Sequence, residues 1–151
     1  MSINGINRIV IAVRDLEAAK KKYEDLLGAT FLDAHWTGEP FGISVSIAWN
    51  AGIELCAPLP GREDSSAVSG FLSRFGEGVM NVYFNVSDGE LAMERAVRHG
   101  YKSVHSLDYS QDEIDDHLAG LFERYQEFNL DTAQSCGFAI SLARIEIKQK
   151  T

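Results

Sequence analysis

The chain has 151 residues, 22 of them acidic and 14 basic, with a formal net charge of −8 and 45% apolar residues. This length fits one or at most two small domains that fold without disulfides or a structural metal. The acidic balance argues against a nucleic acid or an anionic membrane as partner, because phosphate contacts need clustered Lys and Arg. We find no membrane-span-like run and no signal-like start, so we expect a cytoplasmic protein whose two isolated cysteines stay reduced.

An internal repeat divides the sequence into two halves. The segment from Asn7 to Asp15 aligns with the segment from Met80 to Asp88. Each copy is an alternating strand that runs into an aspartate able to cap a following helix. A second match pairs the segment from Gly52 to Leu55 with the segment from Arg144 to Ile147. The sequence therefore predicts two modules of the same kind.

Each module is predicted as a strand, a helix and then about three strands. In the first module the later strands are expected at 30–36, 42–49 and 52–57, and a short helix is expected at 68–75. The predicted boundaries are 1–60 for the first βαβββ module, 61–76 for a linker, and 77–151 for the second module with a helical insert at about 106–135. The insert is predicted from a helix-like run from Glu113 to Phe128. Helices on one face of antiparallel-rich sheets give an α+β fold.

Strand alternation predicts which polar side chains share a face. The apolar positions of the first and last strand of each module are expected to pack against that module's helix. The opposite positions carry Arg8 and Glu54 in the first module, and Asn81 and Glu146 in the second. If a pseudo-twofold relates the modules and their sheets curl toward each other, these four side chains meet in a concavity.

Three more residues are candidates for binding a ligand there. Tyr83 and Asn85 share the face of Asn81 and suit an oxygen-bearing ligand, although a polar rim on a half-open sheet explains them equally well. His35 lies on the second predicted strand, where it faces either the concavity or its rim. No two histidines have the spacing of a common metal motif.

Several motifs resemble the vicinal oxygen chelate superfamily, which includes glyoxalase I, bleomycin-resistance proteins and extradiol dioxygenases. The opening strand of the chain leads into V-R-D-L-E-A-A, which is followed by Y-E-D-L-L-G. Gly52-Ile53-Glu54-Leu55, Pro58-Leu59, Asp64-Ser65-Ser66 and Gly78-Val79 are similar to methylmalonyl-CoA epimerase-like members. The resemblance implies two tandem βαβββ modules forming a cup-shaped mixed β-sheet, a small-molecule ligand and a homodimer.

The resemblance also implies where a metal would bind. Metal-dependent relatives typically use a histidine on the first strand of each module and a carboxylate or amide on the last, and those positions here are Arg8, Glu54, Asn81 and Glu146. Both histidines are replaced, and a guanidinium repels a divalent ion. We therefore expect no metal and no other cofactor.

Arg8 then takes the place of the ion, with two alternatives for its role. In one, Glu146 or Glu54 removes a proton next to a carbonyl while Arg8 stabilises the developing oxyanion. In the other, Arg8, Glu54 and Glu146 form a buried salt-bridge network that joins the modules.

The leading prediction is a metal-independent isomerase or lyase that acts by proton transfer on a carbonyl or acyl small molecule. One alternative is a non-enzymatic binding protein that sequesters a small compound, as bleomycin-resistance relatives do. Another is a metal-dependent epimerase with an altered ligand set. The predicted insert serves as a lid, a dimer contact or packing.

Overall fold

The chain folds into two compact units, which are described separately. A computed structural model describes residues 2–149, apart from the side chains of residues 134 and 135. The N-terminal unit comprises Arg8–Asn81, and the C-terminal unit comprises Met1–Asn7 with Val82–Thr151. Among the described residues, no helix is long and apolar enough to span a membrane.

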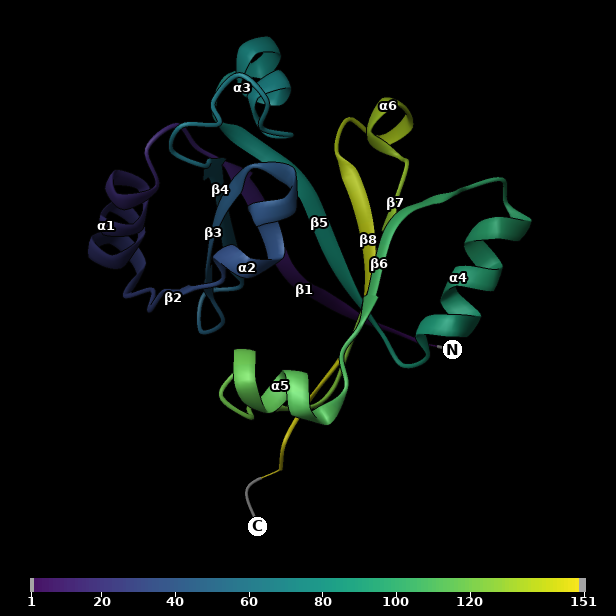
Figure 1. Cartoon of the computed structure of the whole chain (residues 1–151). Coiled ribbons are helices and arrows are strands. Elements are labelled where there is room, and N and C mark those ends of the chain that lie inside the picture. Colours follow the sequence, from purple (N-terminus) through teal and green to yellow (C-terminus); the bar gives the residue numbers. More distant parts are fainter. Residues whose placement is uncertain (1, 150–151) are drawn as a thin grey trace. The chain divides into compact units, whose positions relative to one another are not determined.

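The N-terminal unit holds a four-stranded mixed sheet with the order β2-β3-β4-β1 (Figure 1). Strands β1 and β4 are parallel, whereas β2–β3 and β3–β4 are antiparallel. Its elements are β1 (Ile3–Ala12), α1 (Leu16–Leu27), β2 (Leu32–Asp33), α2 (His35–Gly38), the short 3-10 helix η1 (Glu39–Phe41), β3 (Ile43–Ala48), β4 (Ile53–Pro58) and α3 (Ser69–Phe75).

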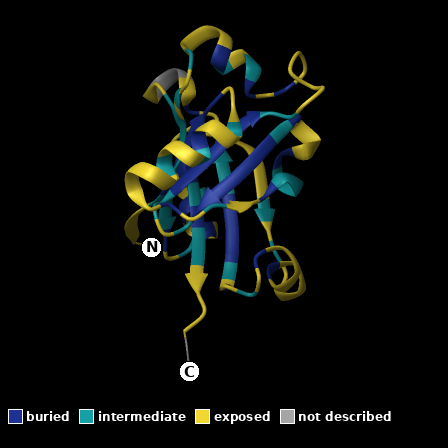
Figure 2. Cartoon of the chain, turned by 90° about the vertical axis from the view of Figure 1, so that its left-hand side faces the viewer, coloured by how far each residue is buried: buried dark blue, intermediate teal, exposed yellow. Residues whose placement is uncertain are grey.

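Helix α1 covers one face of this sheet. It begins after Asp15, whose side chain accepts a hydrogen bond from the backbone N–H of Ala18 at 2.9 Å. It ends at Gly28, which adopts the left-handed conformation with φ 67°. The buried core between helix and sheet contains Ile11, Val13, Ala19, Ile53, Leu55 and Ala57, with Leu16 and Tyr23 packed against it. Figure 2 shows exposed residues on the outer side of the helix and buried strands beneath it.

The C-terminal unit repeats this plan with the strand order β5-β8-β7-β6. Its elements are β5 (Gly78–Val86), α4 (Gly89–Arg98), β6 (Ser103–Asp108), α5 (Gln111–His117), β7 (Phe122–Leu130), α6 (Ala133–Cys136) and β8 (Ala139–Ile147). The first residues of the chain belong here, because the backbone N–H of Ser87 donates to the carbonyl of Ser2 at 3.0 Å. The predicted α+β class with two strand-helix-three-strand modules is confirmed.

Two predicted elements differ in the structure. The run from Glu113 to Phe128 was expected to be one helix, but α5 ends at His117 and β7 starts at Phe122. Ala119 and Gly120 separate them in left-handed conformations, with φ 51° and 63°, which an α-helix cannot continue through. The region 106–135 is therefore not a helical insert. It contains the end of β6, the short helix α5, the long strand β7 and most of α6.

The second predicted strand, at 30–36, is also much shorter than expected. Strand β2 covers only Leu32–Asp33, and His35 opens the short helix α2. The alternation of apolar residues over so few positions fits both a strand and a helical turn. His35 is thus placed by a helix start and not by a strand.

Candidate functional site

Arg8 and Glu54 lie side by side on the face of the N-terminal sheet that points away from α1. In the parallel ladder of β1 and β4, Val10 pairs with Glu54 and Ile9 with Ile53. Ile53 belongs to the core beneath α1, so its neighbour Glu54 points to the other face, as alternation requires. Arg8 shares the face of Val10 for the same reason. The predicted orientation of both side chains in this unit is confirmed.

The two side chains form a buried ion pair. Arg8 Nε donates to Glu54 Oε2 at 2.5 Å, and the two residues are only 2% and 8% exposed. The Arg8 guanidinium carbon also lies 5.3 Å from the centre of the Trp49 ring, within the range of a cation–π contact. A charge-assisted hydrogen bond shielded from water is among the stronger polar contacts in proteins. The pair therefore fixes a positive and a negative group in one orientation.

Cys56 lies two residues after Glu54 on the same face. Its Sγ is 3.8 Å from Glu54 Oε1. Burial raises the pKa of the Cys56 thiol well above its usual value, and the nearby Glu54 charge raises it further. The thiolate is the reactive form of cysteine. Cys56 is thus a neutral packing group beside the ion pair, not a nucleophile.

The C-terminal unit carries a polar network on the face opposite α4. The side-chain amide of Asn129 donates to the Tyr83 hydroxyl at 2.8 Å and to the Ser141 hydroxyl at 2.7 Å. Tyr83 and Ser141 are both buried. Asn85 follows Tyr83 on the same side of β5, and its Oδ1 is buried without a hydrogen-bond donor among the described residues. A buried acceptor of this kind suits a ligand donor.

Glu146 does not face the way the sequence predicted. In the antiparallel ladder of β7 and β8, Gln126 pairs with Arg144 and Arg124 pairs with Glu146. The amide of Gln126 donates to Glu90 of α4 at 2.8 Å, which assigns this row of side chains to the helix face. Glu146 is exposed there, and its carboxylate accepts a hydrogen bond from Arg144 Nε at 2.7 Å. The expectation that it points into a concavity is wrong.

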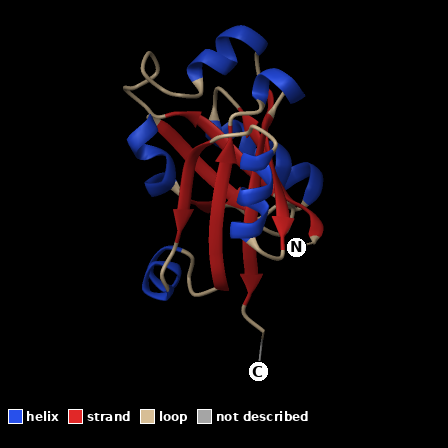
Figure 3. Cartoon of the chain, turned by 90° about the vertical axis from the view of Figure 1, so that its right-hand side faces the viewer, coloured by secondary structure: helices blue, strands red, loops and turns tan. Residues whose placement is uncertain are grey.

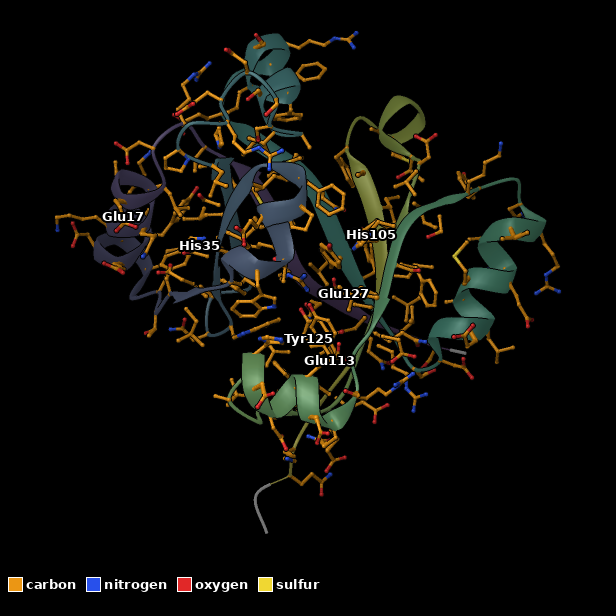
Figure 4. All side chains as sticks on the ribbon, in the orientation of Figure 1. Glu17, His35, His105, Glu113, Tyr125 and Glu127 are labelled. Atoms are coloured by element: carbon orange, nitrogen blue, oxygen red, sulfur yellow. The ribbon has the colours of Figure 1, made fainter. Side chains whose placement is uncertain are left out.

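The buried acid on the other face of this sheet is Glu127. It is 3% exposed and projects from β7 on the side away from α4 (Figure 4). It occupies the same face as Asn129, two residues further along the strand. Sequence reasoning missed it because the segment was assigned to a helix. The sequence carries only a weak signal for it, the alternation of Phe128, Asn129 and Leu130 at the end of the strand.

The structure gives the positions of His35 and Asn81, but their role in ligand binding stays a prediction. His35 Nδ1 accepts a hydrogen bond from the backbone N–H of Val45 at 3.0 Å, and its Nε2 lies 3.9 Å from Asp33 Oδ2. One nitrogen therefore orients the ring on the sheet and the other faces a partly exposed carboxylate. Asn81 is half-buried on β5, at the end of the N-terminal unit.

The positions at which the resemblance implies a metal do not fit a divalent ion. Arg8 stands where a histidine ligand is expected, and its guanidinium already binds Glu54, one of the two carboxylates of the set. Glu146, the second carboxylate, faces α4. Over residues 2–149, no three His, Cys, Asp or Glu side chains come together in a way that could hold a metal ion. A site in which a guanidinium stands beside a carboxylate that it already pairs with is a poor site for Mg²⁺ or Zn²⁺.

Solved structures of similar fold include several methylmalonyl-CoA epimerases. The enzyme from Mycobacterium tuberculosis is 22% identical with a TM-score of 0.68, and the match covers 97% of this chain and 90% of that chain. A variant of the Streptomyces coelicolor epimerase in complex with 2-nitronate-propionyl-CoA is also 22% identical with a TM-score of 0.68, over 95% and 98% of the two chains. A hypothetical protein from Bacillus halodurans matches over 100% and 99%, at 17% identity and a TM-score of 0.70.

These identities establish the shared fold, and the family follows from the sequence match. No curated protein sequence matches the chain significantly. Residues 7–119, which span β1 through α5, match the family model of the Glyoxalase/Bleomycin resistance protein/Dioxygenase superfamily. The family model matches most of the chain, and the two repeated modules agree with it, so the chain belongs to this superfamily.

Proposed function

We propose that the protein is an isomerase or lyase that transfers a proton on a carbonyl or acyl small molecule without a divalent metal. The observation that carries this proposal is the buried Arg8–Glu54 pair at the position where metal-dependent relatives place a histidine and a carboxylate. The structural likeness to methylmalonyl-CoA epimerases, one of them in complex with methylmalonyl-CoA, supports an acyl compound as the substrate class.

The chemistry assigns one role to each member of the pair. Proton abstraction next to a carbonyl needs a carboxylate or similar base, and it develops negative charge on the carbonyl oxygen. Glu54 is the base, and Arg8 is the fixed cation that binds the developing oxyanion. A guanidinium can hold two oxygen anions side by side because its N–H donors point in several directions. In metal-dependent members of the superfamily the ion supplies this charge.

The alternative proposal is a binding protein that sequesters a small molecule without changing it. The same pair supports it. Arg8 is 2% exposed and Glu54 is 8% exposed, and a buried ion pair of this kind can stabilise the fold without taking part in a reaction. A sheet face held rigid by such a pair can line a binding site without taking part in a reaction.

Proton exchange separates the two proposals. Acyl thioesters and 2-oxo compounds are incubated with the protein in D₂O after treatment with EDTA, and deuterium incorporation is followed by mass spectrometry. We expect exchange in the wild-type protein, loss of exchange in Glu54→Gln, and no loss in the control variant Glu24→Gln, which changes an exposed glutamate of α1. Exchange that vanishes with EDTA and returns with Mn²⁺ or Co²⁺ refutes metal independence. Saturable binding with no exchange favours the binding protein.

The homodimer implied by the resemblance and the cytoplasmic location expected from the sequence also stay proposals. Sedimentation velocity over a range of protein concentrations tests the first. A single species at the mass of one chain, 16.7 kDa, contradicts it.

A further inference from the structure

A second site is formed within the C-terminal unit, between α4 and the strands beneath it. Figure 3 shows the side of the molecule on which α4 lies along the sheet. An open hollow of about 760 Å³ lies here, a size typical of small-molecule sites. Its walls are mostly apolar and include Val86, Ala92, Ala96, Leu130, Ile140 and Leu142. It lies on the opposite face of the sheet from Tyr83 and Asn129.

The internal repeat explains why this hollow exists. Asp15 and Asp88 cap their helices in the same way and lie 88 − 15 = 73 positions apart. At this offset Tyr23 of α1 corresponds to Ala96 of α4. Tyr23 packs against the core of the N-terminal unit, whereas Ala96 is buried and lines the hollow. The second module thus lacks the aromatic ring that fills the same place in the first.

Two basic side chains lie at the rim of the hollow. Arg95 and His99 lie one turn apart at the C-terminal end of α4, and both line the hollow. Within the described part of the chain, neither side chain makes an ion pair or a hydrogen bond. An unpaired arginine and histidine beside an apolar hollow are unusual in a protein of net charge −8, where acids are in excess. They are complementary to an anionic group attached to an apolar body.

We propose that this hollow binds an aliphatic carboxylate of the medium-chain fatty-acid class. The hydrocarbon chain lies against Ile140, Leu142 and Ala96, and the carboxylate is held at the rim by Arg95 and His99. This site is separate from the Arg8–Glu54 pair, and its occupation does not depend on the proposed proton transfer.

Calorimetry with decanoate, below its micelle concentration, tests the proposal on the whole protein. We expect one saturable site per chain. The Kd is expected to fall about fourfold for each methylene added from hexanoate to decanoate. Decanol and decyltrimethylammonium serve as the neutral and cationic probes, and both are expected to bind at least about tenfold more weakly. In ¹H–¹⁵N spectra the shifts caused by decanoate are expected on α4 and around Ile140. Equal binding of the three probes, or shifts centred elsewhere, overturns the proposal.

Three variants locate the site. Arg95→Gln is expected to weaken decanoate binding about tenfold and to leave decanol binding unchanged. Arg98→Gln is the matched control, because Arg98 lies on the same helix but lines its outer side with Met93 and Val97. Ala96→Tyr restores the ring of the first module and is expected to abolish binding while the Tm is retained.

Each remaining outcome decides against the site. If Arg98→Gln weakens binding as much as Arg95→Gln, the effect is one of general charge. If Ala96→Tyr folds and still binds decanoate, decanoate does not bind in this hollow. If decanoate does not bind and the signals of α4 shift with protein concentration, a second copy of the chain covers this face.

Discussion

Replacing Arg8 by methionine tests the energetics of the buried ion pair. Methionine keeps an unbranched apolar stem, but it removes the guanidinium with its contact to Trp49 and leaves the Glu54 carboxylate buried without its cation. At the Nε–Oε2 distance of 2.5 Å the attraction lost is about 7 kcal/mol for an effective dielectric constant near 20. Partial hydration of the carboxylate recovers some of this loss. We expect the free energy of unfolding to fall by about 3–5 kcal/mol, as for other buried pairs that lose one partner.

A double-mutant cycle isolates the pair from the rest of the site. Glu54→Leu alone leaves a buried guanidinium and is expected to cost a similar amount. Arg8→Met combined with Glu54→Leu removes both charges, so the double variant is expected to lie within about 1–2 kcal/mol of the wild type. The control is the exposed pair of Lys21 and Asp25 at 2.9 Å, whose side chains are 74% and 65% exposed. Breaking it should cost at most about 0.5 kcal/mol.

Urea unfolding followed by circular dichroism measures all of these variants under one condition. The midpoint and the slope are fitted together, because a change in slope would report a change in the unfolded state. A loss below about 1 kcal/mol for Arg8→Met means that water reaches the pair, and the argument from burial fails. If the losses of unfolding free energy in the two single variants add up in the double variant, the charges act independently.

Three further predictions concern other parts of the chain. In the native protein, Ellman's reagent is expected to modify the exposed Cys136 and not the buried Cys56, whose raised thiol pKa and burial protect it; equal rates for both thiols contradict this. Asp33→Asn is expected to lower stability at pH 7, and the difference should shrink as the pH falls below about 3.8, because hydrogen bonding from Ser46 and then Lys20 lowers the folded pKa of Asp33. A difference that stays constant down to pH 3 would exclude this contribution. Gly89→Ala is expected to cost about 1–3 kcal/mol in urea unfolding, since its Cβ would lie 3.0 Å from the Phe128 ring, whereas Gly70→Ala in α3 meets open space and should be neutral or stabilising.

The elements that sequence reasoning predicted well are those with strong local signals. Asp15 and Asp88 cap α1 and α4 as expected, and Gly28 ends α1. Strand β3 lies within its predicted span, and β4 extends one residue beyond its span, to Pro58. The orientation of Glu54 followed from the apolar residues on either side of it, because both belong to one buried core. In each case a few neighbouring residues decide the structure.

The segment after α5 shows why local spacing alone can mislead. Ile114, Leu118, Phe122 and Tyr125 are all buried, and their spacing fits one face of a helix. In the structure Ile114 belongs to α5 and Leu118 follows its last residue, whereas Phe122 and Tyr125 belong to β7. The apolar pattern was therefore correct about burial and wrong about conformation. The pairing of β7 with its neighbours on both sides outweighs the helical spacing, and such long-range pairing cannot be predicted from one segment.

Glu146 was misplaced by a shift of one residue. The likeness between the closing segments of the two modules aligned Glu146 with Glu54, but the ladder of β7 and β8 places Glu146 opposite Arg124, on the helix face. Because side chains alternate along a strand, a shift of one position sends every side chain to the other face. The register depends on the partner strand, and similarity between two short segments does not specify it.

The division of the chain into two units has a consequence for its synthesis. The residues of the N-terminal unit, Arg8–Asn81, form one uninterrupted stretch, so this unit can complete its contacts while the ribosome is still adding the second half. The C-terminal unit includes the first seven residues, and Ser87 binds the backbone of Ser2 within it. Those residues leave the ribosome before the N-terminal unit, yet we expect them to reach their final place only after the later strands have been made.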